Sequence, residues 1–240
     1  MAILEICTGS IESIRAAALG GAQRVEVCAA LEVGGLTPSY GYLSSVLSHP
    51  LHNSQGQRMA RHILIRPRGG DFCYNDEEQD IILHDIKLCK DLGAEGVVVG
   101  ALTPNGDIDL NACTRFAKAA EGMNLTFHRA FDRCREPEKA LEQIIQMGYN
   151  RLLTSGLAPK AEQALPLLRS LVQQASGRII IMPGSGVTPV NAAHILRETG
   201  TTEIHASAKG QKSHDDPLFP GYFDTSSDIV AQILAEITKK

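Results

Sequence analysis

Charged and sulfur-bearing residues end five short hydrophobic runs in this chain, where turn residues are more usual. The five runs span residues 4–7, 25–28, 63–68, 125–129 and 203–205. A strand that ends on Glu, Arg or His must pair that group or use it, because an unpaired buried charge costs several kcal/mol. Five such endings in one chain predict a single shared polar site, and that site is the best indication of function.

Side-chain alternation along a strand would bring these groups to one side of a sheet. Glu5 shares a face with Cys7, and Glu26 shares a face with Cys28, while the residues between them are apolar. We regard Glu5 and Glu26 as candidate catalytic residues, because carboxylates can transfer protons or bind metals. The alternative is an internal salt-bridge network with no further role, since perturbed charges cluster at working sites but not only there.

Two longer motifs add further candidates. The motif Arg-Pro-Arg-Gly-Gly-Asp-Phe begins at Arg66, and its two arginines and two glycines suit an anion such as carboxylate or phosphate. We expect Arg66 to take part in catalysis and Arg68, on the same face, to bind the ligand. The motif Thr-Phe-His-Arg-Ala-Phe-Asp offers His128 as a base, with Asp132 as its orienting partner or as a helix cap.

A glycine-rich turn follows the seventh strand candidate and contains Gly184, Ser185 and Gly186. Many barrel proteins bind phosphate with the loops after strands seven and eight. These three residues, with Ser207 after the eighth strand candidate, are therefore candidate ligand-binding residues. A glycine-rich turn alone is a weak signal for phosphate.

The thiols suggest a different chemistry. Cys7 and Cys28 should share a face on adjacent strands, and soft thiolate pairs favour Cu(I). The alternative is that both are small apolar residues packed in the core, as buried cysteines often are. The six cysteines contain no C-x-x-C pair and lack the dense spacing of a disulfide scaffold, so we expect the reduced thiols of a cytoplasmic protein.

Strand-like and helix-like segments alternate from end to end. Strand candidates lie near residues 2–7, 24–28, 62–67, 96–100, 124–128, 151–155, 179–183 and 203–207. Helical patterns lie near residues 10–19, 38–47, 76–92, 109–121, 136–147, 160–174, 189–198 and 225–238. Eight strands alternating with eight helices predict an α/β fold, a (β/α)8 TIM barrel. A doubly wound open sheet is the runner-up, weakened because no G-x-G-x-x-G motif follows the first strand.

In such a barrel the polar strand ends face the interior near the carboxyl-terminal mouth, where loops carry the chemistry. Two segments depart from tight strand–helix connections. Residues 48–61 read as a polar loop at the amino-terminal rim, and residues 206–226 as a long loop after strand eight at the carboxyl-terminal rim. We expect residues 1–240 to form a single domain.

Composition excludes several classes of partner. A net charge of −4 over 240 residues gives no basic patch, so nucleic acid is not expected as a partner. The longest apolar stretches are far too short to cross a bilayer, and the N-terminus has no signal-peptide pattern. We therefore expect a cytoplasmic protein without membrane contact.

Together these residues resemble the CutC family of copper homeostasis proteins. The resemblance covers most of the chain and is carried by residues 4–7, 24–29, 34–39, 65–76, 126–132, 152–156 and 182–186. It implies a cytoplasmic TIM barrel that forms a homo-oligomer, a dimer or a tetramer, and binds Cu(I). The resemblance implies a copper-binding role for Cys7 and Cys28 before any other residue. The resemblance weakens after Ser207.

Two hypotheses follow. The first is a copper-handling protein with the thiolates of Cys7 and Cys28 as ligands. The second is an enzyme that acts on a small anionic metabolite, phosphorylated or not, at the barrel mouth. The family favours the first hypothesis, whereas the number of charges expected at the mouth favours the second.

Overall fold

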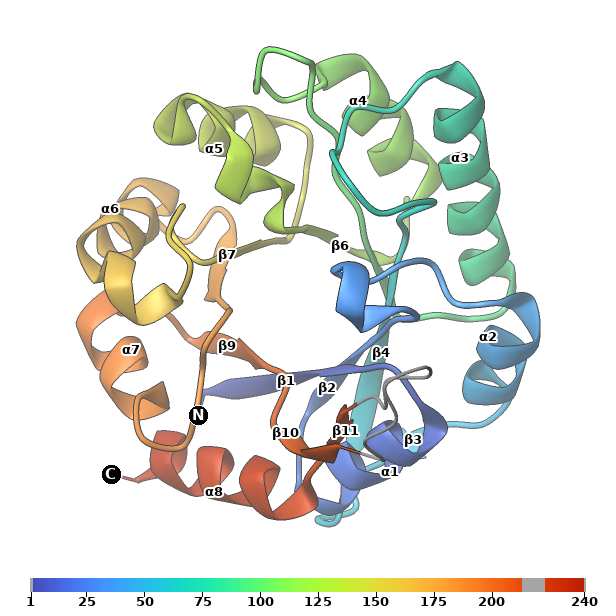
Figure 1. Ribbon diagram of the computed structural model, residues 1–240. Coiled ribbons are helices and arrows are strands. Elements are labelled where there is room, and N and C mark those ends of the chain that lie inside the picture. The colour runs from blue at the N-terminus through green and yellow to red at the C-terminus, as the bar shows by residue number, and fades with distance from the viewer. Residues whose placement is uncertain (1, 213–222, 240) are drawn as a thin grey trace.

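The computed structural model describes residues 2–212 and 223–239, and in it eight parallel strands form a ring surrounded by helices (Figure 1). The ring consists of β1 (Ile3–Thr8), β2 (Arg24–Val27), β4 (Arg58–Leu64), β5 (Gly96–Val98), β6 (Asn124–Phe127), β7 (Arg151–Thr154), β8 (Ile180–Pro183) and β9 (Glu203–Ala206). The helices are α1 (Ile11–Leu19), α2 (Tyr40–Leu47), α3 (Asp76–Asp91), α4 (Leu110–Ala119), α5 (Pro137–Gln146), α6 (Leu165–Ala175), α7 (Ala192–Thr199) and α8 (Ser227–Thr238). The predicted (β/α)8 barrel is confirmed.

The barrel is nearly closed. Hydrogen-bonded pairing runs from β8 through β7, β6, β5, β4, β2 and β1 to β9. Between β8 and β9, the hydroxyl of Thr201 donates to the carbonyl oxygen of Ile181. In this arrangement all eight strands end at the same mouth, which brings the polar strand ends together.

Local sequence explains where the helices begin. Before α3, the side chain of Asn75 accepts from the Glu78 amide, and the Glu78 carboxylate accepts from the Asn75 amide. This capping box satisfies two amides that the first helical turn leaves without partners. The buried side chains of α3, among them Ile82, Ile86 and Cys89, recur at helical spacing and turn one face of the helix toward the sheet.

The alternation predicted along the strands is correct. The apolar residues between the polar ones, such as Ile6, Val27, Phe127 and Ile204, are fully buried in the core. The polar residues on the same strands face the barrel interior instead. Burying an apolar side chain of this size contributes about 1.5–3 kcal/mol, so a shift in strand register that exposed these residues would be strongly disfavoured.

The segment 48–61 differs from the predicted loop, because part of it is a β-hairpin. Strand β3 (Leu51–His52) pairs antiparallel with the first residues of β4. In the turn, the Asn53 side chain accepts from the amides of Gln55 and Gln57, and Gly56 has a φ of 74°. The polar turn residues were recognisable in the sequence, but the hairpin needs the tertiary partner strand. Strand β4 therefore begins four residues before the predicted position and ends at Leu64.

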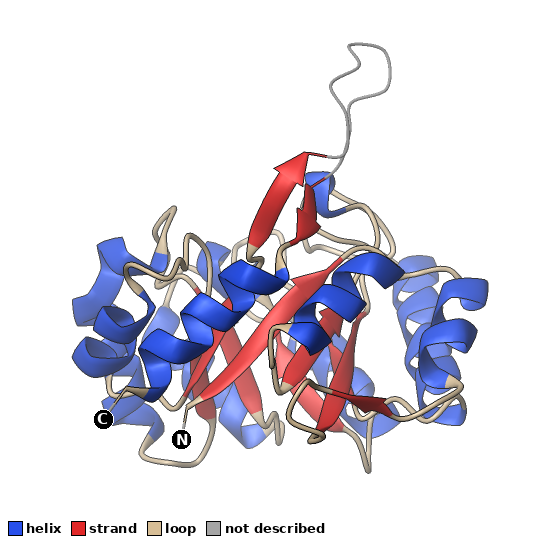
Figure 2. Ribbon diagram, turned by 90° about the horizontal axis from the view of Figure 1, so that it is seen from below, coloured by secondary structure: helices blue, strands red, loops and turns tan. Residues whose placement is uncertain are grey.

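The segment 206–226 also contains regular structure. Strands β10 (Lys209–Lys212) and β11 (Phe223–Thr225) form an antiparallel ribbon. Figure 2 shows this ribbon projecting from the end of the barrel opposite the N-terminus. The middle of the predicted loop, residues 213–222, lies outside the described residues. Among the residues that are described, no helix is long and apolar enough to span a membrane.

Candidate functional site

A pocket of about 310 Å³ opens at the carboxyl-terminal mouth of the barrel. Its floor is formed by the ends of β1, β2 and β9, and its walls by the loops that follow β4, β6 and β8. The predicted site residues among its lining are Cys7, Glu26, Cys28, Arg66, His128, Ser185, Gly186 and Ser207. The prediction that separate strands deliver polar groups to one opening is therefore correct.

Cys7, Glu26 and His205 form a compact cluster on the floor of this pocket. One ligand atom from each of the three residues lies within 4.8 Å of the other two. The sulfur of Cys28 lies 3.9 Å from that of Cys7, and Nε2 of His205 lies 3.9 Å from Oε2 of Glu26. Strand register produces the cluster, because Cys7 is paired with Glu26 across β1 and β2.

Glu5 lies beneath this cluster and orients it. Its Oε1 is 2.7 Å from Nδ1 of His205, and the register of β1 and β9 pairs these two residues. With Nδ1 engaged by Glu5, Nε2 is the ring nitrogen left for Cys7 and Glu26. Glu5 is fully buried and does not line the pocket, so it acts through His205 and not by contact with a ligand.

The charges in the cluster depend on one another. The hydrogen bond from the Cys28 thiol lowers the pKa of Cys7 to about 5, although burial opposes this. Burial raises the pKa of Glu26 to about 8, and the negative charge of Cys7 adds to that shift. Burial alone would lower the pKa of His205, but contacts with Cys7 and Glu5 raise it well above its usual value. At neutral pH this arrangement favours a Cys7 thiolate, a protonated Glu26 and an imidazolium at His205.

A second set of charges fills the barrel below the pocket. Arg24 donates to both Glu5 and Glu203, and Arg151 donates to Glu203 with Nε 2.7 Å from Oε2. Burial opposes ionisation of Glu5, but the adjacent Arg24, followed by His205, holds its pKa well below the usual range. These groups pair with one another inside the barrel. For this layer the alternative of an internal salt-bridge network is correct.

Arg66 is held in the wall of the pocket by backbone carbonyls. Its NH1 donates to the carbonyls of Val33 and Gly35, and its NH2 to that of Gly70, at 2.8–3.2 Å. No carboxylate in the described part of the chain forms an ion pair with it. Since an uncompensated buried charge is costly, Arg66 is suited to receive an anionic ligand.

His128 lines the same wall, but it is not arranged as a base. Its Nδ1 accepts from the amide of Ala130 at 3.3 Å, which leaves the ring proton on Nε2 when the imidazole is neutral. Burial, followed by the nearby charge of Arg66, lowers the pKa of His128 to about 3. The neutral ring therefore presents an N–H donor, and the predicted role of His128 as a base gives way to that of a hydrogen-bond donor.

Besides Glu5, two more predicted site residues, Arg68 and Asp132, lie outside the pocket. Arg68 is on a loop beyond β4, where its Nε pairs with Glu78 at 2.5 Å and its NH1 with Asp71 at 3.0 Å. Strand alternation does not apply to it, because β4 ends at Leu64. Asp132 accepts from the Thr154 hydroxyl and from the amides of Ser155 and Leu157, so it anchors the loop after β7.

The glycine-rich turn reaches the pocket only in part. Gly184 does not line it, since this residue is packed against Leu153 and His205. Ser185 and Gly186 do line it and have φ values of 82° and 70°. Their amides make no hydrogen bond with any residue that the structure describes, whereas the Ser185 hydroxyl donates to the Pro159 carbonyl.

Sequence reasoning left some lining residues out of the site. His205 was recognised as a strand ending but was not assigned a ligand or catalytic role, although its position two residues after Glu203 places it on the interior face. Phe72, Arg129 and Lys209 also line the pocket. Phe72 lies on a loop, Arg129 in a short 3-10 helix and Lys209 at the start of β10, all outside the strands whose alternation was used for the prediction.

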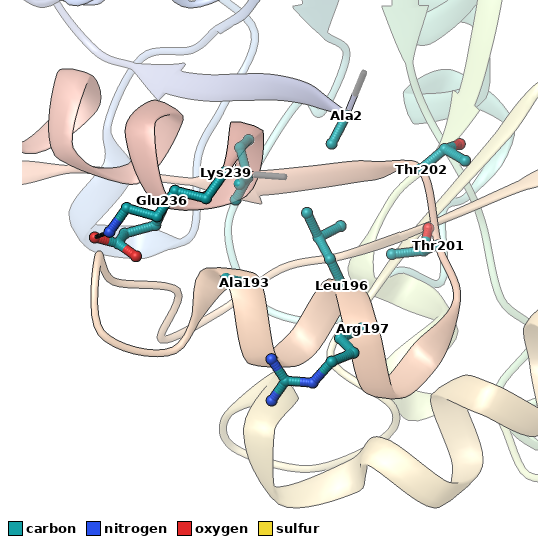
Figure 3. Close-up of a pocket in the computed structure, with 9 residues that line it drawn as sticks. Ala2, Ala193, Leu196, Arg197, Thr201, Thr202, Glu236 and Lys239 are labelled. Atoms are coloured by element: carbon teal, nitrogen blue, oxygen red, sulfur yellow. Dashed lines mark hydrogen bonds and ion pairs between the residues drawn. The ribbon is translucent and has the colours of Figure 1, made fainter.

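A larger surface hollow, about 670 Å³, lies at the other end of the barrel. Figure 3 shows its labelled residues, which come from the start of β1, from α7, from the link before β9 and from the end of α8. Neither cysteine nor histidine is found among the described residues that line it. Because the groups able to do chemistry converge elsewhere, we assign the functional site to the smaller pocket at the mouth.

The fold and the site define a (β/α)8 barrel with a thiol, carboxyl and imidazole cluster at its carboxyl-terminal mouth. The chain belongs to the CutC family, whose family model matches residues 2–210. The match ends close to Ser207, where the resemblance seen in the sequence also weakens.

Known proteins agree with this assignment. A family protein CutC from Bacteroides thetaiotaomicron is 51% identical over 205 residues, which cover 85% of this chain and 80% of the relative. The crystal structure of CutC from Streptococcus agalactiae, a protein named for copper homeostasis, is 33% identical with a TM-score of 0.80, covering 86% of this chain and 99% of that one.

More distant structures share the barrel alone. Thiamine phosphate pyrophosphorylase from Pyrococcus furiosus is 14% identical, has a TM-score of 0.60 and covers 98% of this chain and 95% of its own. At this identity the likeness concerns only the fold. The function must therefore be argued from the side chains at the mouth.

Proposed function

We propose that this protein takes part in copper homeostasis by binding Cu(I) through the thiolates of Cys7 and Cys28. The observation that carries this proposal is the 3.9 Å separation of the two sulfur atoms. Two sulfur ligands at roughly 2.3 Å from one metal ion, with a trigonal or tetrahedral angle between them, lie roughly 4 Å apart. Soft thiolates select Cu(I) over harder ions.

His205 is the proposed third ligand. Its Nε2 is free of Glu5 and lies in the cluster with Cys7. The imidazolium at His205 and the thiol of Cys28 would each release a proton on binding the metal, because metal ligands must be deprotonated. The contact from Glu5 to Nδ1 repeats the arrangement in which a carboxylate orients a metal-bound histidine and makes it more basic. Glu26 is close enough to contribute an oxygen, but a carboxylate is a poorer ligand for Cu(I) than sulfur or imidazole.

The test replaces both sulfur ligands. The double variant Cys7→Ser/Cys28→Ser should lose Cu(I) affinity by more than about a hundredfold, because loss of outer partners alone costs about 10- to 100-fold. An anaerobic titration against a chromophoric Cu(I) chelator measures this affinity. Cys73→Ser is the matched control, since Cys73 lies on a loop and does not line the pocket. A double variant that binds Cu(I) as tightly as the parent would exclude this site.

A second function is supported by the size and lining of the pocket. About 310 Å³ is far more than one ion needs and lies at the lower end of the range for small-molecule sites. The free amides at Ser185 and Gly186, with Ser207 beside them, could bind a phosphate group. This supports the hypothesis of an enzyme that acts on a small anionic metabolite, with Glu26 and Arg66 in its pocket.

A crystal soak tests the second function. Inorganic phosphate or a sugar phosphate should give electron density against the amides of Ser185 and Gly186. The physical reason is that these two successive amides have no protein partner among the described residues and are therefore available to an anion. If the mouth stays empty at high phosphate concentration, the glycine turn is plain loop geometry and a phosphorylated substrate is excluded.

The proposal also includes the cellular location and the oligomeric state of the protein. Cu(I) binding needs reduced thiols, which fits the expected cytoplasmic location. We also expect a homo-oligomer, a dimer or a tetramer. Light scattering coupled to size-exclusion chromatography measures the assembly directly.

A further inference from the structure

Two buried N–H donors in the pocket wall have no acceptor among the described residues. They are Nε of Arg66 and Nε2 of His128. Each of the two residues is only 4% exposed, and both line the pocket at the mouth. Since buried polar groups in folded proteins are almost always hydrogen-bonded, two unsatisfied donors on residues that line one pocket indicate the place of a ligand acceptor.

Phe72 holds both donors in position. The guanidinium carbon of Arg66 lies 4.8 Å from the centre of the Phe72 ring. The His128 ring centre lies 4.9 Å from the same point, with the two rings inclined at 55°. The three side chains, Arg66, Phe72 and His128, form a rigid unit that we term the donor clamp.

The glycine residues around Arg66 are part of this unit. Gly34 has a φ of 90°, and a Cβ atom built there would lie 3.0 Å from NH1 of Arg66. The carbonyls of Gly35 and Gly70 accept from the guanidinium. These contacts use NH1 and NH2 of the guanidinium and leave Nε without a partner among the described residues.

The charge of the clamp selects the class of ligand. His128 is neutral as a donor, so Arg66 supplies the one positive charge, and no carboxylate of the described residues pairs with it. Within the clamp the remaining capacity is therefore one negative charge and an oxygen that accepts hydrogen bonds, while Arg129, which also lines the pocket, is already paired with Asp132. A carboxylate fits this description, because its plane and single charge match a guanidinium. A doubly charged phosphate would need more donors than the clamp offers.

We propose that the donor clamp binds the carboxylate of a small organic acid. Its oxygens accept from Arg66 and His128, and the rest of the molecule lies over the floor of the pocket, facing Cys7 and Glu26. This inference builds on the second function above, because it names the chemical class of the anionic ligand. It does not depend on the copper proposal.

The clamp lies across the mouth from the glycine turn. Arg66 and Phe72 follow β4, and His128 follows β6, whereas Ser185 and Gly186 follow β8. Three strands separate β4 from β8 in either direction around the barrel. These are β5, β6 and β7 on one side, and β2, β1 and β9 on the other. A carboxylate on the clamp and a phosphate on the glycine turn would therefore occupy different walls of one pocket.

Isothermal titration of the full-length protein with propionate, propionamide and inorganic phosphate tests the assignment. Propionate should bind, and its uncharged amide should bind at least about tenfold more weakly, since hydrogen bonds to charged groups are the stronger ones. The variants Arg66→Lys and His128→Phe should each weaken propionate binding by about tenfold. Lysine keeps the positive charge but lacks the planar guanidinium, and phenylalanine keeps an aromatic ring but has no N–H donor.

Three controls distinguish a lost donor from a damaged fold. His128→Gln restores an N–H donor and should recover most of the affinity that His128→Phe loses. Arg68→Lys, outside the pocket, should leave propionate binding unchanged. Cu(I) affinity should be unaffected in His128→Phe, so failure of the clamp and failure of the copper site give different results.

Several outcomes would overturn the proposal. The first is the absence of any propionate binding to the parent protein. The second is propionate binding that Arg66→Lys and His128→Phe leave unchanged. The third is phosphate binding that both substitutions weaken, which would assign the clamp to phosphate instead of carboxylate.

Discussion

Each ionisable residue at the mouth takes its role from one or two neighbours. Glu5 and Glu26 are both buried acids on adjacent strands, yet Arg24 and His205 keep Glu5 ionised, whereas burial raises the pKa of Glu26 to about 8. His205 and His128 differ in the same way. Contacts with Cys7 and Glu5 raise the pKa of His205 and favour its protonated form, whereas burial, followed by the charge of Arg66, lowers the pKa of His128 and keeps it neutral.

Asp132 also takes its role from its immediate neighbours, because its carboxylate oxygens anchor the start of the loop after β7. We expect Asp132→Ala to lower the free energy of unfolding by about 2–4 kcal/mol, since it leaves the buried Thr154 hydroxyl and Ser155 amide without an acceptor. Urea denaturation followed by circular dichroism measures the change. Asp80→Ala is the control, because Asp80 forms only a surface pair with Arg115, worth about 0–1 kcal/mol.

A different result would restore the predicted catalytic role of Asp132. If Asp132→Ala kept its stability but lost ligand binding or Cu(I) binding, the residue would act at the pocket and not in the loop. The hydrogen bonds from Thr154, Ser155 and Leu157 make us expect the opposite.

At the scale of elements, charged side chains near the starts of strands link neighbouring strands to one another. Glu95 precedes β5 and accepts from Nε, NH2 and the amide of Arg61 on β4, at 2.7–3.0 Å. Arg58, also on β4, pairs with the same carboxylate at 2.9 Å. Burial opposes the ionisation of Glu95, but these contacts lower its pKa from 4.5 to about 2.

This shift predicts a pH-dependent contribution to stability. A carboxyl group whose pKa is lower in the folded state stabilises the fold above its unfolded pKa, and the contribution is lost as the pH falls. Glu95→Gln should therefore cost about 1–2 kcal/mol at pH 6, an amount discounted for partial exposure. The difference from the parent should disappear between pH 4.5 and about pH 2.

Urea denaturation of both proteins at several pH values measures this difference. Glu12→Gln serves as the control, because Glu12 pairs with Arg15 at 3.6 Å on an exposed surface and should show little difference at any pH. A Glu95→Gln deficit that stayed constant from pH 6 to pH 2 would contradict the ionic explanation and indicate a packing effect.

For the whole molecule, the barrel interior has two layers with different purposes. The lower layer contains Arg24, Arg151 and Glu203, which pair with one another, so that little charge is left uncompensated there. The upper layer contains the thiols, the imidazole and the donor clamp, several of which lack protein partners among the described residues. A closed barrel makes this division possible, because alternate strands contribute the inward-facing side chains of successive layers.

Some of this was determined by the sequence alone. Alternating strand and helix patterns predicted the barrel, and the spacing of two between Glu5 and Cys7, or Glu26 and Cys28, predicted which side chains enter it. Such periodicity is local and repeats along the chain, so it can be read without knowing what packs against it. The same argument applied to Arg68 was wrong, because the periodicity ends where β4 ends, at Leu64.

Only the tertiary structure decided what the interior groups do. It separated Glu5, which orients His205, from Glu26, which lines the pocket, although the two look alike in the sequence. It also moved Asp132 from the site to a loop anchor and made His128 a donor instead of a base. The physical reason is that ionisation and hydrogen bonding depend on distances of a few ångströms between residues far apart in the chain, and only the closed barrel sets those distances.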